Sequence, residues 1–134
     1  MSEYLFVYGT LLPSEAGRNM LSIVRQLRKI GPAHVRGRLF DLGEYPGAIL
    51  DVNAETKIEG EVFELPTDPS VLAELDAYEG YELADPTRSL FIRVKSSAQL
   101  SDGRDVESWI YVYNRDPGKA PLITDGNYRK SKAA

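Results

Sequence analysis

Two short segments that lie far apart in the chain carry residue types from which an active site can be built. Near the N-terminus an apolar run ends in a glycine turn, and such a turn can direct backbone N–H groups at an anion. These would be the N–H groups of Gly9, Thr10 and Leu11. Far downstream, Glu79 supplies a carboxyl group at the end of a predicted helix. A backbone cradle for an anion together with a carboxylic acid indicates a small enzyme.

Two helices are predicted to position these segments. The first is expected to begin at Ser14, a good N-cap residue, and to end at the Gly31-Pro32 pair, because apolar residues recur between them at helical spacing. The second is expected to begin at Asp68, which can also act as an N-cap and precedes a proline, and to end at Gly80. The candidate acid therefore lies beside the end of this second helix.

The rest of the chain reads as short strands separated by turns. Strand-like stretches are predicted over residues 4–8, 33–42, 47–52, 57–65, 90–94 and 106–113. Many short strands with two helices favour an α+β fold, here a small mixed β-barrel with flanking helices, over an alternating βαβ protein. The length suits a single domain, which we place at residues 1–126, and the basic residues 127–134 are expected to form a flexible tail.

Composition narrows the class of protein. The 134 residues carry a net charge of −4 with their basic residues scattered along the chain, which argues against a nucleic-acid partner. The absence of cysteine excludes thiolate nucleophiles and thiolate metal sites, and is compatible with a reducing cytosol. No stretch approaches a membrane span, and no basic leader precedes the first apolar run. We expect a soluble, cytoplasmic protein that is a monomer or a weak homodimer.

Four motifs follow one another in an order that resembles a known family. The resemblance is to the gamma-glutamylcyclotransferase-like (AIG2-like) proteins, and it covers residues 4–113. The motifs are Tyr8-Gly9-Thr10-Leu11, Gly37-Arg38-Leu39-Phe40-Asp41-Leu42 leading to Tyr45-Pro46-Gly47, Gly60-Glu61-Val62-Phe63, and Leu75-Asp76-Ala77-Tyr78-Glu79-Gly80-Tyr81.

The resemblance implies a compact β-barrel whose mouth holds a gamma-glutamyl group and one essential carboxylate, which by motif is Glu79. In such enzymes the free α-amine of the gamma-glutamyl group attacks its own side-chain amide. The products are 5-oxoproline and a free amine or amino acid, and no cofactor is needed. The family also places its binding loop at residues 9–11.

The chemistry of a glutamate at this position agrees with that role. An ammonium must lose a proton before it attacks and the departing nitrogen must gain one, and a single carboxyl group can carry out both transfers. Glu79 faces the negative end of the helix dipole, and partial burial would further disfavour its charge, so we expect its pKa to be raised. Outside the motif context, a glutamate at a helix end is usually a solvated residue, and a glycine turn usually just ends a strand.

Other residues are weaker candidates. Tyr8 and Tyr81 are expected to line the pocket, since a phenol offers an apolar face and a polar tip, although such tyrosines are more often core residues. Arg93 can hold a carboxylate, but its commoner place is the outer face of an edge strand, and we leave it out of the catalytic set. The family often has a tyrosine where this chain has Leu90-Phe91-Ile92, so we expect this chain to lack any contact made by that hydroxyl.

Alternative sites and functions remain at this point. His34 is the single histidine and lacks partners for a zinc site or a serine triad, so we predict a structural role for it and no metal. Glu44, Glu61 or Glu64 could form a two-carboxylate glycosidase site with Glu79, but no spacing supports such a pair. The alternative function is a non-catalytic module of the same fold that binds a small carboxylate metabolite. The leaving group of a gamma-glutamyl substrate stays open.

Overall fold

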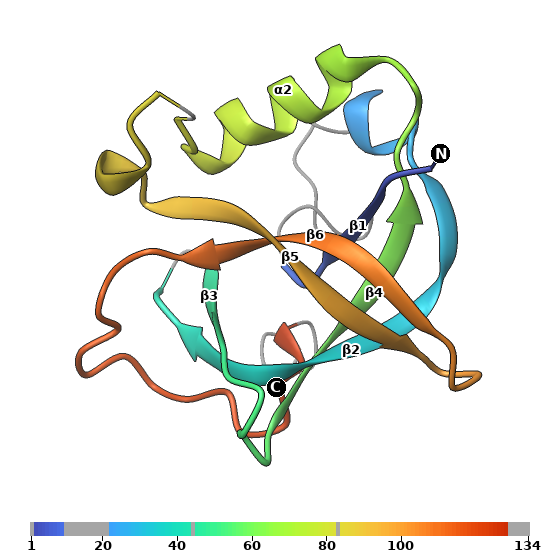
Figure 1. Cartoon of the computed structure of the whole chain (residues 1–134). Helices are drawn as coiled ribbons and strands as arrows, with labels where there is room; N and C mark the ends of the chain where they lie inside the picture. The colour runs from blue at the N-terminus through green and yellow to red at the C-terminus, as the bar shows by residue number, and fades with distance from the viewer. Residues whose placement is uncertain (1, 10–21, 44, 83, 129–134) are drawn as a thin grey trace.

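The computed structural model describes residues 2–9, 22–43, 45–82 and 84–128 (Figure 1). Strands make up most of this part of the chain, with one helix of 11 residues, α2. In chain order the elements are β1 (Tyr4–Val7), β2 (Arg28–Asp41), β3 (Pro46–Leu50), β4 (Lys57–Glu64), α2 (Pro69–Glu79), the 3-10 helix η1 (Pro86–Arg88), β5 (Phe91–Leu100) and β6 (Asp105–Tyr113).

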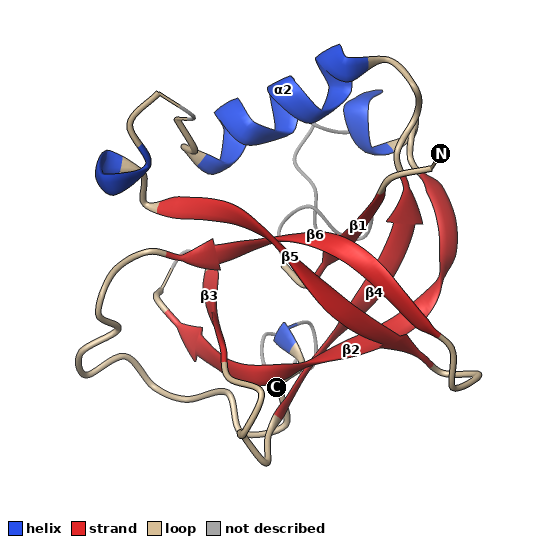
Figure 2. Ribbon diagram, in the orientation of Figure 1, coloured by secondary structure: helices blue, strands red, loops and turns tan. Residues whose placement is uncertain are grey.

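Five of the strands close into a mixed barrel (Figure 2). The sheet order is β3-β2-β4-β1-β6-β5, and an additional pairing of β2 with β5, at Ala33 with Leu100, completes the ring. The pairing of β1 with β6 is parallel, at Leu5 with Trp109, and the other ladders are antiparallel. The predicted α+β fold with a small mixed β-barrel is therefore confirmed.

Strand β2, the longest strand with 14 residues, pairs with β3 and β4 as well as with β5. Residues Arg28 to Arg36 pair with β4, and residues Gly37 to Asp41 pair with β3. A Cβ atom at Gly37 would collide with the carbonyl oxygen of Ile49, so only glycine lets the two backbones approach this closely. This arrangement leaves β3 paired to β2 beside the barrel, near the ends of β1 and β6 (Figure 1).

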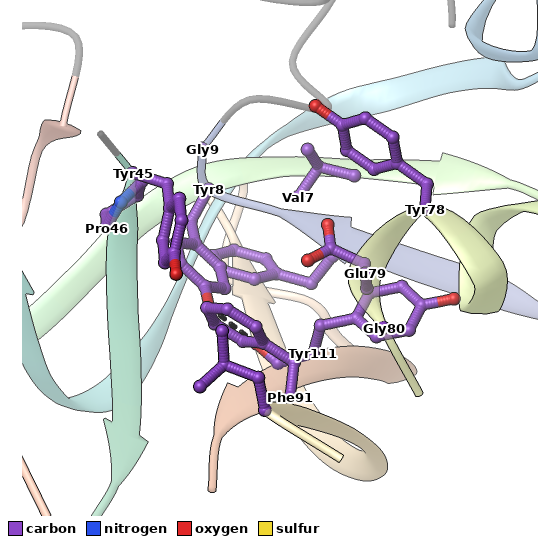
Figure 3. A pocket seen from close by; sticks show the side chains of 12 residues that line it. Val7, Tyr8, Gly9, Tyr45, Pro46, Tyr78, Glu79, Gly80, Phe91 and Tyr111 are labelled. Atoms are coloured by element: carbon purple, nitrogen blue, oxygen red, sulfur yellow. Dashed lines mark hydrogen bonds between the residues drawn. The ribbon is translucent and has the colours of Figure 1, made fainter. Parts of the chain in front are cut away.

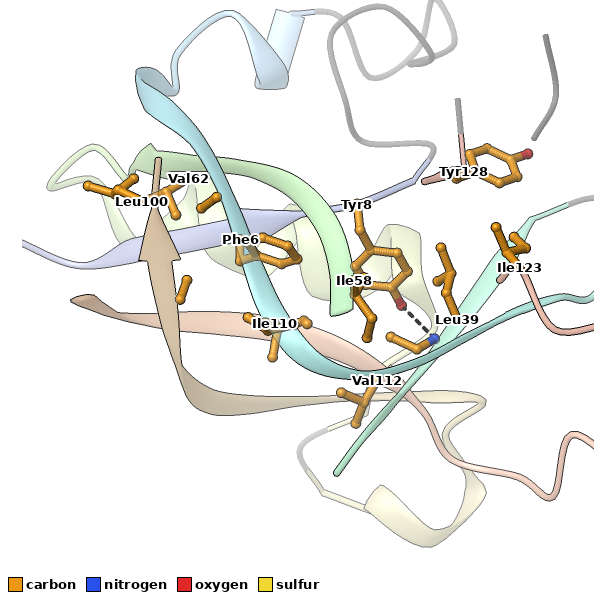
Figure 4. Packing of buried hydrophobic residues seen from close by; sticks show 14 residues of the cluster. Phe6, Tyr8, Leu39, Ile58, Val62, Leu100, Ile110, Val112, Ile123 and Tyr128 are labelled. Carbon is orange, nitrogen blue, oxygen red and sulfur yellow. Dashed lines mark hydrogen bonds between the residues drawn. The ribbon is translucent and has the colours of Figure 1, made fainter. Parts of the chain in front are cut away.

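Strand β1 is buried on both faces. Phe6 and the following Tyr8 pack inside the barrel, where Ile58 and Ile110 surround them (Figure 4). Leu5 and Val7 face outward and pack in a second apolar cluster under α2. Alternate residues of one strand thus contribute to two cores, which explains why the sequence there is apolar without alternation.

Helix α2 begins and ends where the sequence predicts. The Asp68 carboxylate accepts a hydrogen bond from the Ser70 N–H at 3.0 Å, which caps the N-terminus. Gly80 adopts φ 74°, a left-handed conformation that ends the helix, and its N–H donates to the Ala77 carbonyl at 3.2 Å. The cap makes Glu79 the last helical residue.

Two predicted boundaries are wrong. The first predicted helix was to reach Gly31, but in the described part of it only a turn at residues 22–24 is helical, and β2 already begins at Arg28. Pairing with β4, including Arg28 with Glu64, outweighs the local helical pattern, and the ladder has a register shift between Lys29 and Gly31. Strand β5 extends to Leu100 because its polar second half pairs with β6. The predicted cap at Ser14 lies outside the described residues.

The chain after β6 returns across the barrel and is part of the domain. The Ile123 N–H donates to the Leu39 carbonyl at 2.7 Å, and the Glu59 N–H donates to the Gly126 carbonyl at 2.8 Å. Tyr128 is buried in the barrel core, so the domain extends past residue 126, where the tail was expected to begin. Residues 129–134 lie outside the described part. No helix among the described residues is long and apolar enough to cross a membrane.

Two glycines provide a test of this returning segment. Gly118 and Gly126 both have positive φ, at 58° and 69°, but only at Gly126 would a Cβ collide with a neighbour, the Lys57 carbonyl. We expect Gly118→Ala to cost about 1 kcal/mol of unfolding free energy from φ strain alone, and Gly126→Ala to cost at least about twice as much. Urea denaturation measures both values, and equal losses would show that the segment does not press against β4.

Candidate active site

A cavity of about 460 Å³ lies where the end of β1 meets the C-terminal end of α2 (Figure 3). Residues before β3, at the start of β5 and on β6 complete its wall. Aromatic and apolar side chains predominate. The lining residues are Phe6, Val7, Tyr8, Gly9, Tyr45, Pro46, Tyr78, Glu79, Gly80, Leu90, Phe91 and Tyr111.

Glu79 carries the one carboxyl group among these lining residues. It is partly buried, and its carboxyl group points toward Tyr8 in Figure 3. Among the described residues no side chain forms a hydrogen bond or an ion pair with this carboxyl group. Burial raises the pKa of Glu79 to about 7, which matches the predicted direction. The site therefore holds a carboxyl group that can exchange a proton near neutral pH.

Tyr8 contributes its ring, because its hydroxyl is occupied within the protein. The hydroxyl donates a hydrogen bond to the Tyr111 carbonyl at 2.6 Å and accepts one from the Ala48 N–H at 3.3 Å. Burial first, and then the nearby Glu79 charge, raises the pKa of Tyr8, so the phenol stays neutral. Tyr8 thus ties β6 to β3 beneath the cavity.

The Tyr111 hydroxyl is also occupied. It donates to an Asp76 carboxylate oxygen at 2.6 Å, and Asp76 receives two further hydrogen bonds from Arg93, at 2.8 and 3.1 Å. The Arg93 guanidinium lies over the Trp109 ring, 4.2 Å from its centroid. Burial is the main reason why the pKa of Tyr111 is raised, and its hydrogen bond to Asp76 adds to the effect.

The outward placement expected for Arg93 is wrong. Its side chain is 10% exposed because Asp76, itself 9% exposed, offers a charge partner under α2. Sequence reasoning missed Asp76 as well, although a signal exists. Asp76 follows Leu72 by four residues, so it falls on the buried side of the helix, where a carboxylate requires a partner.

The structure brings some of the sequence candidates together. Tyr8, Gly9 and Glu79 line the same cavity. About 70 residues of chain separate Gly9 from Glu79, and compact folding brings the two together. Thr10 and Leu11 lie outside the described residues. Tyr81 is not among the lining residues; its ring lies 5.8 Å from the Arg93 guanidinium.

Sequence reasoning missed most of the aromatic wall. Tyr45 reaches the cavity from the loop before β3, Tyr78 from α2 and Tyr111 from β6, and spacing in the chain cannot relate them. Phe91 occupies the stretch where the family often has a tyrosine, and its ring packs against Tyr45 with centroids 5.7 Å apart. That part of the wall is therefore apolar in this chain.

The alternative sites do not form among the described residues. His34 lies within β2, paired opposite Glu59 of β4 and Gln99 of β5, and no cluster of three potential metal ligands occurs in the described ranges. Glu61 pairs with Lys29 at 3.5 Å, and Glu64 with Arg28 at 2.7 Å, both away from the cavity. Glu44 is outside the described residues.

Gly9 closes the other side of the cavity. A Cβ atom at this position would lie 2.7 Å from Pro46 Cγ, so glycine is needed where the end of β1 passes the start of β3. Gly9 lines the cavity across from Glu79 (Figure 3). Together these features can bind a small molecule and move a proton on it.

Comparisons with known proteins agree with this geometry. The chain is 32% identical over 126 residues to the gamma-glutamylcyclotransferase family protein ytfP of Citrobacter rodentium, covering 92% of this chain and 93% of that protein. Its fold is similar to the crystal structure of a mouse AIG2-like protein, with a TM-score of 0.72 at 19% identity, over 95% of this chain and 88% of the other.

A second solved structure is the Bacillus subtilis protein YkqA, with a TM-score of 0.72 and 25% identity. It matches 100% of this chain, which spans 44% of the length of that protein. The sequence profile described as "Gamma-glutamyl cyclotransferase, AIG2-like" matches residues 5–130. The chain therefore belongs to the AIG2-like gamma-glutamyl cyclotransferase family.

Proposed function

We propose that this protein is a gamma-glutamyl cyclotransferase in which Glu79 is the general acid and base. The observation that carries the proposal is the position of Glu79, whose carboxyl group has a raised pKa and faces an aromatic cavity opposite Gly9. Membership of the family supplies the reaction class. The substrate is a small molecule with a gamma-glutamyl group linked through an amide.

The reaction needs no group beyond the substrate and one proton carrier. The Glu79 carboxylate takes a proton from the α-ammonium, and the resulting amine attacks the γ-carbonyl carbon. A C–N bond forms within the gamma-glutamyl group, which closes the five-membered ring of 5-oxoproline. The protonated Glu79 gives this proton to the departing nitrogen, and the amide C–N bond breaks. The ring nitrogen also loses its second proton through the Glu79 carboxylate, and the departing amine takes up this proton and leaves as an ammonium ion. A carboxyl group with a pKa near 7 suits both transfers at neutral pH.

The walls of the cavity support this use of Glu79. Aromatic rings limit access of water to the carboxyl group, which strengthens electrostatic interactions inside the cavity. The backbone N–H groups from Gly9 to Leu11 are proposed to bind the α-carboxylate, with only Gly9 in the described part. The alternative, a module that binds a small carboxylate metabolite without turnover, predicts affinity without 5-oxoproline.

Replacement of the proton carrier distinguishes the two functions. We expect Glu79→Gln to lower kcat for 5-oxoproline release by roughly 10²- to 10⁴-fold, because glutamine cannot transfer protons. The matched control is Glu74→Gln, an exposed glutamate of the same helix, which should retain full activity. A panel of gamma-glutamyl amino acids and amines is used for the measurement. No 5-oxoproline from folded wild type on any of them would contradict the enzyme and favour the binding module.

The raised pKa of Glu79 also predicts how the stability of the folded protein depends on pH, which can be measured without substrate. The pKa of Glu79 is raised by burial from an ordinary 4.5 to about 7 in the folded protein. The folded state therefore binds a proton more tightly than the unfolded state, so stability falls as pH rises between these values. Above about pH 7 the full cost is at most about 3 kcal/mol.

Glu79→Gln removes this cost because its side chain is neutral at every pH. We expect the variant to be more stable than wild type near pH 8 by up to about 3 kcal/mol, and equally stable near pH 4. Urea denaturation at the two pH values checks the difference. A stability difference that is the same at both would mean that Glu79 titrates normally.

The Gly9 turn can be tested separately. In Gly9→Ala the added methyl group meets the Pro46 ring, so the Gly9 backbone or Pro46 must move, and both line the cavity. We expect KM to rise by roughly tenfold or more, as for the loss of one charge-assisted hydrogen bond to the substrate carboxylate. Gly103→Ala, in the β5–β6 turn with open space around it, is the control for generic strain. An unchanged KM in folded Gly9→Ala would place the carboxylate elsewhere.

A further inference from the structure

The proposed proton transfers do not use the buried cluster of Asp76, Arg93 and Tyr111. Asp76 accepts three hydrogen bonds there, two from Arg93 at 2.8 and 3.1 Å and one from the Tyr111 hydroxyl at 2.6 Å. The side chains of Asp76 and Arg93 are 9% and 10% exposed. Of the ion pairs formed by the described residues, this one has both partners buried to that degree.

A buried ion pair needs an explanation other than stability. Removing two charges from water costs about as much as their attraction returns, and apolar residues of similar size often stabilise a protein equally well. What the pair provides is defined geometry, because the two parallel hydrogen bonds from a guanidinium to a carboxylate fix both groups. The question is therefore which part of the molecule the pair holds in place.

The pair connects the last turns of α2 to the barrel. Asp76 lies three residues before Glu79 on the helix, while Arg93 is on β5 and Tyr111 is on β6. The network continues through the Tyr111 carbonyl, which accepts the Tyr8 hydroxyl at 2.6 Å. Tyr8 directly precedes Gly9. Tyr111 thus links the helix turn that carries Glu79, through its hydroxyl, to Tyr8 on the other side of the cavity, through its backbone carbonyl.

We propose that Asp76 and Arg93 are positioning residues, which hold Tyr111 and the last turn of α2 so that the Glu79 carboxyl group keeps its place against the Tyr8–Gly9 turn. This inference rests on the proposed function, because position matters most if Glu79 must reach both nitrogens of the substrate. Displacement by about 1 Å can reduce a rate by roughly 100-fold. The hydroxyls of Tyr8 and Tyr111 then hold the cavity wall in place through hydrogen bonds within the protein, and their rings contact the substrate.

The same geometry controls how Glu79 ionises. The titratable side chains that share its cavity are Tyr8 after β1, Tyr45 before β3, Tyr78 on α2 and Tyr111 on β6. Asp76 and Arg93 are the charged pair behind Tyr111. If the last turn of α2 loosens, water reaches the Glu79 carboxyl group, and its pKa should fall from about 7 toward the ordinary value for glutamate.

Arg93→Lys and Tyr111→Phe test the proposal. Lysine keeps the charge of Arg93 but cannot form two parallel hydrogen bonds. Phenylalanine removes only the Tyr111 hydroxyl, which donates a hydrogen bond to Asp76. Arg28→Lys is the matched control, since Arg28 pairs with Glu64 at 2.7 Å on the barrel surface with 72% exposure. For each variant kcat, KM and thermal stability are measured, and NMR with ¹³C-labelled glutamate follows the titration of the Glu79 carboxyl carbon.

We expect Arg93→Lys to lower kcat by roughly 10- to 100-fold with KM changed by less than about threefold, and to lower the pKa of Glu79. Tyr111→Phe should do the same to a smaller extent, and Arg28→Lys should change neither. If folded variants lose thermal stability while kcat and the Glu79 titration stay at wild-type values, the pair is only structural and the proposal is wrong.

The outcomes separate this inference from the proposed function. If wild type releases no 5-oxoproline but the Glu79 titration shifts in Arg93→Lys, the positioning role stands and the cyclotransferase activity fails. If wild type is active and the titration does not move in either variant, the positioning role fails alone. If Arg93→Lys does not fold, Tyr111→Phe decides the matter, because it retains the ion pair and the ring.

Discussion

The burial of β1 on both faces is the constraint on which the rest of the structure depends. Phe6 and Tyr8 fill the barrel, while Leu5 and Val7 face outward and would meet water if nothing covered them. Helix α2 packs on this outer side through Val71 and Leu75. Apolar burial is nondirectional, so it brings the helix to β1 without defining the contact further. The direction comes from the polar network at the end of the helix.

Two carboxyl groups on the last turns of α2 have opposite environments. Asp76 faces the barrel and is matched by a guanidinium and a phenol, so its charge is compensated. Glu79, one turn later, faces the cavity and has no such partner among the described residues. Burial without compensation disfavours ionisation, which explains why the pKa of Glu79 moves to about 7. The left-handed cap at Gly80 makes Glu79 the last helical residue, next to the cavity.

Much of the local structure could be predicted from the sequence. The limits of α2 follow from an N-cap with proline after it and a glycine at the other end, which act within a few residues. The stretches that become β3, β4 and β6 are apolar or alternating and are bounded by turn residues, and their predicted limits lie close to the observed ones. The helical pattern before Gly31 failed because pairing of Arg28 and Lys29 with β4 is a long-range effect that no local pattern contains.

The sequence by itself determined the candidate acid, the glycine turn and the family resemblance, because each rests on neighbouring residues in the chain. Only the tertiary structure decided that β2 and β5 close the barrel, and that three tyrosines and a phenylalanine from separate elements join Tyr8 around Glu79. It also decided that Arg93 turns inward to Asp76. The physical reason is that strand pairing, burial and charge compensation act between residues distant in sequence, and their partners are defined only when the chain has closed on itself.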